Sequence, residues 1–305
     1  MNATTNGTTN GTTNGTMNGT MNGTLGGIVD STRAELMRLR KWPAVWIVVG
    51  AWLALSLMFG YLFDYLAYRS GDSGFSNEGE TKAQLLAGLL PPAVPDVMVQ
   101  GLPMFGGALV MVLGALAAGN GFAWGTWKTV FTQGKPRTSV TIGSLLAVSA
   151  FVVLVMLVST VLCLGCSSLI AATEGHSLTM PGLGDVARSF GGGLLVLEMW
   201  ALLGFAAGVL AKGPALAVGL GLVWLLVVEN LLRGVGSLLS VVDAITHVLP
   251  GTAAGSLVGA LVGKAGGAPG VLVDISGGRA LVTVVAYVVA LVGLTLVVVR
   301  RRDVA

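Results

Sequence analysis

Long apolar segments alternate with short polar ones along most of the chain. A membrane's hydrocarbon core is roughly 30 Å thick and takes about 20 helical residues to cross. Six apolar segments approach or exceed that length, at approximately residues 44–66, 98–118, 140–172, 186–210, 215–232 and 280–299. The third is longer than the core requires, so it must tilt, kink or protrude. The pattern predicts an all-α, polytopic membrane protein with six transmembrane helices.

The region between the last two spans, residues 233–278, is less hydrophobic. It contains two short apolar segments, "SLLSVVDAITHVL" and "TAAGSLVGALVG", which Leu249-Pro250-Gly251 separates. Each is too short to cross a bilayer. We therefore expect two short extracytoplasmic helices here, interfacial or re-entrant, before the last span.

The composition agrees with a membrane protein. Of the 305 residues, 54% are hydrophobic and only 10% are charged, whereas soluble domains carry about 25% charged residues. The net charge of +3 is too small to indicate a nucleic-acid partner. Cys163 and Cys166 lie in an apolar run with no further metal ligand nearby, which favours simple packing. We predict no metal site.

The basic residues are divided unevenly between the two sides that six spans would create. Both termini share one side, and that side holds eleven of them: Arg33, Arg38, Arg40, Lys41, Lys128, Lys135, Arg137, Lys212, Arg300, Arg301 and Arg302. The opposite side holds six: Arg69, Lys82, Arg188, Arg233, Lys264 and Arg279. Because short cytoplasmic segments carry the excess of Lys and Arg, we predict that both termini are cytoplasmic.

The N-terminal region divides into two parts. Residues 1–24 are an uncharged Asn/Gly/Thr repeat that cannot bury enough apolar surface to offset its ordering entropy, so we expect a disordered cytoplasmic tail over residues 1–29. In residues 30–42, Arg33, Arg38 and Arg40 alternate with apolar residues, which predicts a basic amphipathic helix at the membrane surface. Residues 43–305 would then form the six-span domain.

An aromatic and basic segment, "WGTWKTVFTQGKPR" (residues 124–137), interrupts the apolar pattern between spans two and three. If residues 122–132 form a helix, Trp124, Trp127 and Phe131 share one stripe, while Lys128 lies elsewhere around it. Pro136 ends such a helix. Periodicity alone is equally compatible with an interfacial helix that merely connects two spans.

The residues of this segment also resemble a known family. Gly125-Thr126, followed by a basic residue, apolar residues and a Gly-x-x-Arg turn, resembles the cytoplasmic loop of ATP-binding-cassette (ABC) permeases of the type-2, exporter-like class. The order of elements over residues 30–305 and the closing "RRRDV" are similar to that family too. The acidic residue that usually precedes Gly-Thr is absent, since residues 120–123 read Asn-Gly-Phe-Ala.

The resemblance implies a coupling helix that docks into an ATPase subunit, with Arg33–Lys41 as its neighbour. The residues it assigns to this contact are Trp124, Gly125, Thr126, Trp127, Lys128, Thr129, Phe131, Gly134 and Arg137. The chain has no G-x-x-x-x-G-K-[ST] motif, so ATP and Mg would be bound by a separate cytoplasmic ATPase. We expect two such permeases, identical or different, to export a hydrophobic or amphipathic substrate across a bacterial plasma membrane.

Ionisable residues within spans raise alternatives, because burying them in a membrane is costly. Glu198, near the middle of the fourth span, is a candidate for the transport path or for a structural hydrogen bond to a neighbouring helix. In the first case the chain could be a secondary transporter driven by protons or sodium. A non-transporting membrane scaffold is the other alternative. Glu229 and Arg233, at i and i+4, are expected to form a local salt bridge.

Overall fold

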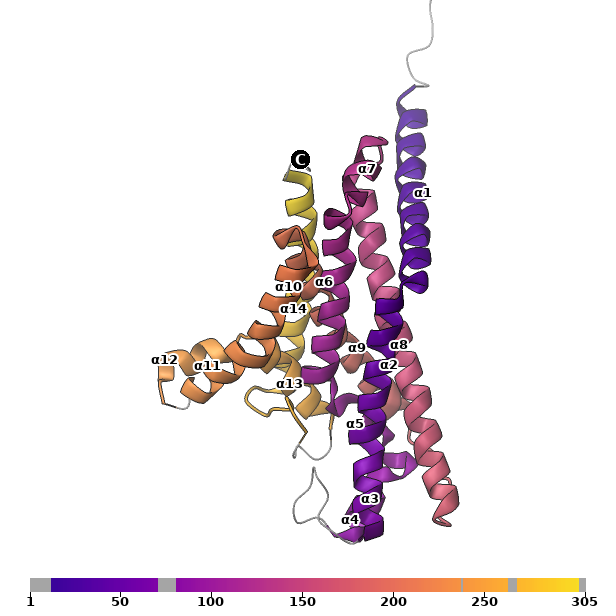
Figure 1. Ribbon diagram of the computed structural model, residues 1–305, viewed down its shortest axis with the longest axis vertical. Coiled ribbons are helices and arrows are strands. Elements are labelled where there is room, and N and C mark those ends of the chain that lie inside the picture. The colour runs from indigo at the N-terminus through magenta and orange to yellow at the C-terminus, as the bar shows by residue number, and fades with distance from the viewer. Residues whose placement is uncertain (1–11, 71–80, 237, 263–267, 302–305) are drawn as a thin grey trace, which may run out of the picture.

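The computed structural model of this chain describes residues 12–70, 81–236, 238–262 and 268–301, with side chains from residue 25 onward. These residues are helical or in turns and loops, with no strand among them (Figure 1). In chain order the helical elements are α1 (Thr12–Lys41), α2 (Pro43–Leu57), η1 (Met58–Leu62), α3 (Phe63–Ser70), α4 (Lys82–Leu89), η2 (Pro91–Ala93), α5 (Val94–Gln100), η3 (Leu102–Gly106), α6 (Gly107–Ala123), α7 (Thr126–Thr132), α8 (Arg137–Thr173), α9 (Leu183–Ala211), α10 (Pro214–Val223), η4 (Trp224–Val228), α11 (Glu229–Gly236), α12 (Ser240–Thr246), α13 (Pro250–Leu261) and α14 (Gly277–Arg301).

Six helices within the described residues are long and apolar enough to cross a membrane: Pro43–Ser70, Leu102–Ala123, Arg137–Thr173, Leu183–Ala211, Pro214–Gly236 and Gly277–Arg301. They match the six predicted spans, so the all-α fold with six candidate spans is confirmed. The long third span is one helix, α8, of 37 residues. At 1.5 Å per residue it is about 55 Å long, and it runs from the end of the bundle near α7 to the end near α3 and α4 (Figure 1).

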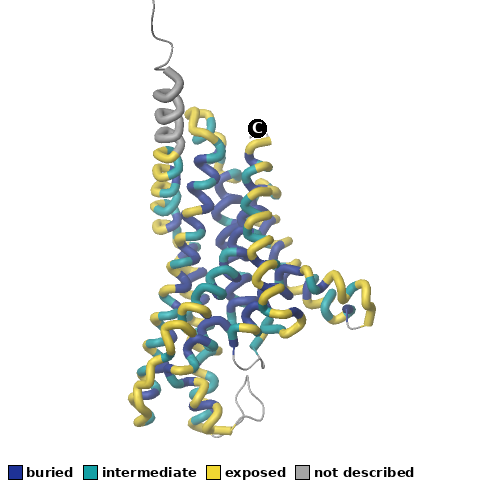
Figure 2. Tube along the Cα trace, turned by 180° about the vertical axis from the view of Figure 1, so that it is seen from behind, coloured by how far each residue is buried: buried dark blue, intermediate teal, exposed yellow. Residues whose placement is uncertain are grey.

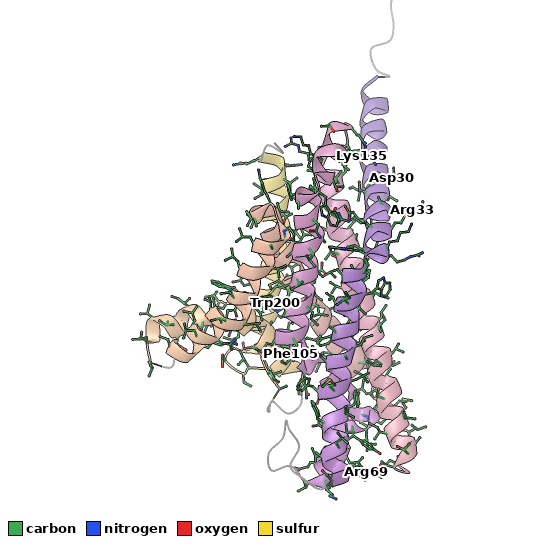
Figure 3. All side chains as sticks on the ribbon, in the orientation of Figure 1. Asp30, Arg33, Arg69, Phe105, Lys135 and Trp200 are labelled. Atoms are coloured by element: carbon green, nitrogen blue, oxygen red, sulfur yellow. The ribbon has the colours of Figure 1, made fainter. Side chains whose placement is uncertain are left out.

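The bundle has two distinct ends (Figure 1). One, called here the α7 end, contains α7 and the C-terminal end of α14, and α1 extends beyond it. The opposite end, called the α4 end, contains α3 and α4. Lys135 lies at the first end and Arg69 at the second (Figure 3).

The core of the bundle is the pair α6 and α9, which pack at close range. A Cβ atom added at Gly204 or Gly208 would collide with the backbone carbonyl of Met111 or Ala115, and one at Gly114 would collide with that of Ala201. The Gly204–Gly208 spacing in the sequence predicts this approach, as small residues do between membrane helices. Buried positions follow these central helices, and exposed ones follow the periphery (Figure 2).

One part of the fold differs from the sequence prediction, and another decides between two predicted alternatives. The residues between the first two predicted spans contain α4, η2 and α5, for which no helix was predicted, and Val94 and Val99 of α5 are fully buried. Between spans five and six, α12 and α13 meet at 69°, and both predicted short helices are present. α13 lies in the bundle, since Ala253, Ala254 and Val258 are fully buried, and this fits the re-entrant alternative and not the interfacial one.

Helix α1 also differs from its prediction. It begins at Thr12 and so includes residues 12–29, which were expected to be disordered; residues 1–11 lie outside the described part of the chain. No proline interrupts the helical hydrogen bonding of this stretch. The helix runs along α8, where a Cβ at Gly143 would touch Ser31. Its axis follows the long axis of the bundle (Figure 1), whereas a helix lying on the membrane surface would run across it.

Candidate functional site

The segment between spans two and three folds as a short helix that is separate from α6. Gly125 breaks the predicted helix over 122–132, because it has φ +67°, a left-handed conformation that favours glycine. α7 then covers Thr126–Thr132 and ends before Gly134, which has φ +81°. Gly125 and Gly134, two of the residues on which the ABC-permease resemblance rests, therefore mark the two ends of α7. Pro136 precedes the first residue of α8.

Trp127 anchors α7 to the bundle. Its side chain is only 3% exposed. The ring stacks on Phe122 of α6 with centroids 5.1 Å apart, meets Phe131 edge-on at 5.5 Å, and lies 6.5 Å from Phe205 of α9. It occupies the space beside Gly121, where a Cβ would collide with the indole. Trp127 therefore ties α7 to both helices of the core pair.

Trp124 does not share this stripe. It belongs to the turn before α7, its side chain is 62% exposed, and its ring meets Trp42 edge-on at 6.0 Å. The prediction that Trp124, Trp127 and Phe131 form one stripe is wrong, because the turn at Gly125 rotates Trp124 away from the other two. Trp124 instead contacts the junction of α1 and α2.

The other residues assigned to the expected ATPase contact divide into an exposed group and a half-buried group. Lys128, Thr129 and Gly134 are exposed, as is Lys135. Arg137 is half-buried, with its guanidinium 5.6 Å from the ring centroid of Phe131, a geometry that favours cation–π attraction. Thr126 is half-buried in the first turn of α7. The exposed side chains of α7 and of the turn after it are therefore polar and basic, whereas Trp124, in the turn before α7, exposes an aromatic ring.

The three arginines predicted for the interfacial helix have different surroundings. Arg33 and Arg40 are exposed. Arg38 points inward: its Nη2 donates to the carbonyl oxygen of Ala117 on α6 (2.8 Å) and pairs with Glu35 (2.9 Å). Burial raises the pKa of the Glu35 carboxyl, which the charge of Arg38 partly opposes. Arg38 thus joins α1 to the end of α6 that leads into α7.

Glu198 forms a hydrogen bond with a neighbouring helix. The hydroxyl of Ser149 on α8 donates to its carboxylate. This is the structural alternative considered for Glu198 in the sequence. Arg233 donates to Asn230 at 2.9 Å, and the described ion pairs do not include one between Arg233 and Glu229. The prediction of a salt bridge between Glu229 and Arg233 is therefore wrong.

Glu229 itself is fully buried. Trp224 donates its indole N–H to Glu229 Oε1 at 2.8 Å, and the carboxylate contacts Gly251 in the first turn of α13. The positive end of the helix dipole favours a negative group at that place. The contact depends on the return of α13 into the bundle, which was one of the two alternatives that the sequence pattern left open.

A cavity of ≈ 520 Å³ lies at the α4 end, among α2, α3, α4, α5 and α8. Its described lining is mostly apolar and aromatic, with a few carboxylate, amide and hydroxyl groups: Trp52, Leu55, Ser56, Phe59, Gly60, Asp64, Gln84, Ala87, Gly88, Ala93, Asp96, Val97, Met98, Gln100, Gly101, Phe105, Ser159, Cys163, Val262, Ala268 and Pro269. Glu198 is not among these residues. The sequence pattern did not predict this cavity, because part of its wall comes from α4 and α5, which were not predicted as helices. Among the described residues there is also no group of three or more His, Cys, Asp or Glu side chains that could hold a metal ion.

The chain matches no protein-family model, and no curated protein matches it. The function is therefore inferred from its own residues and their arrangement.

Proposed function

We propose that this chain is the membrane-spanning subunit of an ABC exporter, with α7 as the helix that docks on a separate cytoplasmic ATPase. Two such subunits, identical or different, would pair with two ATPase subunits. ATP binding would close the ATPase pair, and α7 would transmit that movement to the spans. The cargo would be a hydrophobic or amphipathic compound moved outward across a bacterial plasma membrane.

The observation that carries this proposal is the construction of α7. A helix that only connects two spans needs no rigid attachment. Here a buried indole fixes α7 to α6 and α9, while Lys128, Thr129 and Lys135 remain exposed. An exposed polar face on a rigidly held helix is suited to receiving a partner and passing its movement inward.

The packing of α6 against α9 supports transmission of such a movement. Because backbone meets backbone at Gly114, Gly204 and Gly208, the two helices cannot slide past each other without large rearrangement. A displacement of α7 would therefore move α6 and α9 together. Arg38 would couple α1 to the same unit through Ala117. These contacts give the proposed ATPase a mechanical path into the centre of the bundle.

The charge of the exposed face provides the test. The double variant Lys128→Glu/Lys135→Glu changes only exposed side chains, so it should fold normally but bind the ATPase at least about tenfold more weakly, since interfacial charge reversal costs more than 1.4 kcal/mol. Arg188→Glu, an exposed reversal on the first part of α9, is the control. The measurement is affinity for, and stimulation of, an ATPase encoded by a neighbouring gene. Wild-type binding by the double variant would refute the docking assignment.

The secondary-transporter alternative gains no support from the surroundings of Glu198. Its carboxylate bonds to Ser149 on the adjacent helix and does not line the cavity. Ion-driven uptake or efflux by the lone chain in vesicles, abolished by Glu198→Gln, would favour that alternative over an exporter.

A further inference from the structure

Three tryptophans gather where the first two candidate spans end on the α7 side of the bundle. Trp42 directly precedes the span Pro43–Ser70, and Trp46 lies in the first turn of that span. Trp124 directly follows the span Leu102–Ala123, and its ring meets that of Trp42 edge-on at 6.0 Å. Tryptophan is enriched at the ends of membrane spans, where its ring lies at the level of the lipid headgroups.

Two of these rings are exposed although the residues that carry them are held in place. Trp46 is 49% exposed and Trp124 is 62% exposed. The indole N–H of Trp46 donates to the carbonyl oxygen of Arg40 at 2.8 Å, and its ring meets Phe151 of α8 edge-on at 6.1 Å. Ile47, next to Trp46, is 69% exposed. Large apolar side chains that are gathered together and left uncovered indicate an interaction surface.

Cationic side chains adjoin the exposed rings on the side away from the span. Arg40 and Lys41, in the last turn of α1, are exposed, and the described ion pairs include neither of them. The nearby acid Glu35 is paired with Arg38 instead. Over residues 40–47 the exposed side chains thus change from cationic through aromatic to apolar at Ile47. A leaflet of anionic phospholipid presents complementary groups in the same order, from phosphate to acyl chain.

We infer that this surface, defined by Arg40, Lys41, Trp46, Ile47 and Trp124, binds an anionic phospholipid of the leaflet at the α7 end. The two cations attract the phosphate group, the two indoles lie at headgroup depth, and Ile47 contacts the acyl chains. Such a lipid contacts α1, α2 and the turn before α7 together, so it braces the base of α7. The inference assigns Trp124 to the lipid, whereas the family resemblance assigned Trp124 to the ATPase contact.

The test compares two lipids with identical acyl chains and different headgroup charge. Native mass spectrometry of the purified chain in neutral detergent measures its affinity for phosphatidylglycerol, which is anionic, and for phosphatidylcholine, which has no net charge. The chain should bind phosphatidylglycerol at least about tenfold more tightly, because two cations near an anionic headgroup each contribute roughly fivefold. Inorganic phosphate should not displace the lipid, because it has no acyl chains to contact Ile47.

Single substitutions locate the site on the surface of α1. Arg40→Gln and Lys41→Gln should each weaken phosphatidylglycerol binding about fivefold. Arg33→Gln is the matched control, because Arg33 is also exposed on α1. It lies eight residues before Lys41, which is about 12 Å along the helix and farther than the Debye length of about 8 Å at physiological ionic strength. The control should therefore change the affinity less than about twofold.

Three results would each overturn the inference: equal affinity for the two lipids, displacement of phosphatidylglycerol by inorganic phosphate, or equal losses in Lys41→Gln and Arg33→Gln. Trp124→Ala tests the assignment of that ring. It should weaken phosphatidylglycerol binding and leave ATPase docking unchanged, and the opposite pattern would return Trp124 to the ATPase contact.

The result is independent of the ATPase test, because the inference requires only that the chain spans a membrane. If phosphatidylglycerol binds as stated but Lys128→Glu/Lys135→Glu leaves ATPase docking intact, the lipid assignment stands and the coupling assignment fails. If α7 proves to be the docking helix and the chain does not distinguish the two lipids, the exporter proposal stands and the lipid assignment is wrong.

Discussion

The central pair of helices and the peripheral spans are similarly apolar but very differently buried. The spans containing α6 and α9 have mean hydropathies of 1.9 and 2.1, and 67% and 61% of the residues in their most apolar 18-residue segments are buried. The spans Pro214–Gly236 and Gly277–Arg301 have values of 2.1 and 2.8, with only 22% and 17% buried. Hydropathy thus identifies a span but does not say whether it faces protein or lipid. The difference lies in glycines that allow backbone contact, and α7 is attached to the glycine-rich pair.

The largest expected effect comes from the residue that attaches α7 to this pair. Trp127→Ala should destabilise the protein by about 3–5 kcal/mol, the usual cost of removing a large buried aromatic side chain. Trp124→Ala, in the same segment but 62% exposed, should cost much less. Thermal unfolding in detergent or nanodiscs measures both. Similar losses for the two variants would show that α7 is not anchored through Trp127.

A smaller effect distinguishes the central pair from the periphery directly. Gly204→Ala places a methyl group against the Met111 carbonyl, and overpacking of this kind costs about 1–3 kcal/mol. Gly293→Ala in α14, where a Cβ meets nothing within 4 Å, should be neutral or slightly stabilising because alanine favours a helix. If both substitutions change the unfolding midpoint equally, the central pair is not more tightly packed than the periphery.

These examples also show what the sequence could predict. Apolar run lengths identified all six spans, and the Gly204–Gly208 spacing predicted a close helix contact. The position of Trp124 could not be predicted from helical periodicity, because Gly125 adopts a left-handed conformation and interrupts the helix between Trp124 and Trp127. The cavity requires α4 to pack beside α3, and α5 to pack beside α8 and α9, and the sequence pattern predicted neither α4 nor α5. The hydropathy of a short helix does not indicate whether that helix packs back against the bundle.

The smallest expected effect lies at the exposed end of α8. Glu174 accepts hydrogen bonds from Tyr65 (2.9 Å) and Tyr68 (3.0 Å) of α3, and these lower the pKa of its carboxyl. The stabilisation is therefore complete above the pKa of the unfolded chain, about 4.3 for glutamate, and is lost as the pH falls through the lower folded value. Glu174→Gln should have a slightly lower thermal unfolding midpoint than the wild type at neutral pH, and the difference between the two midpoints should shrink as the pH is lowered. A difference that does not change with pH would contradict this role of Glu174.

The central claim is that the exposed face of α7 contacts an ATPase. A photo-crosslinking amino acid placed at Lys128 tests this most directly, because Lys128 is exposed beside the buried Trp127. The same substitution at the exposed Arg188 is the reference. The account predicts a crosslink to the co-expressed ATPase from position 128 and none from position 188. No crosslink from position 128, or equal crosslinking from both positions, would contradict it.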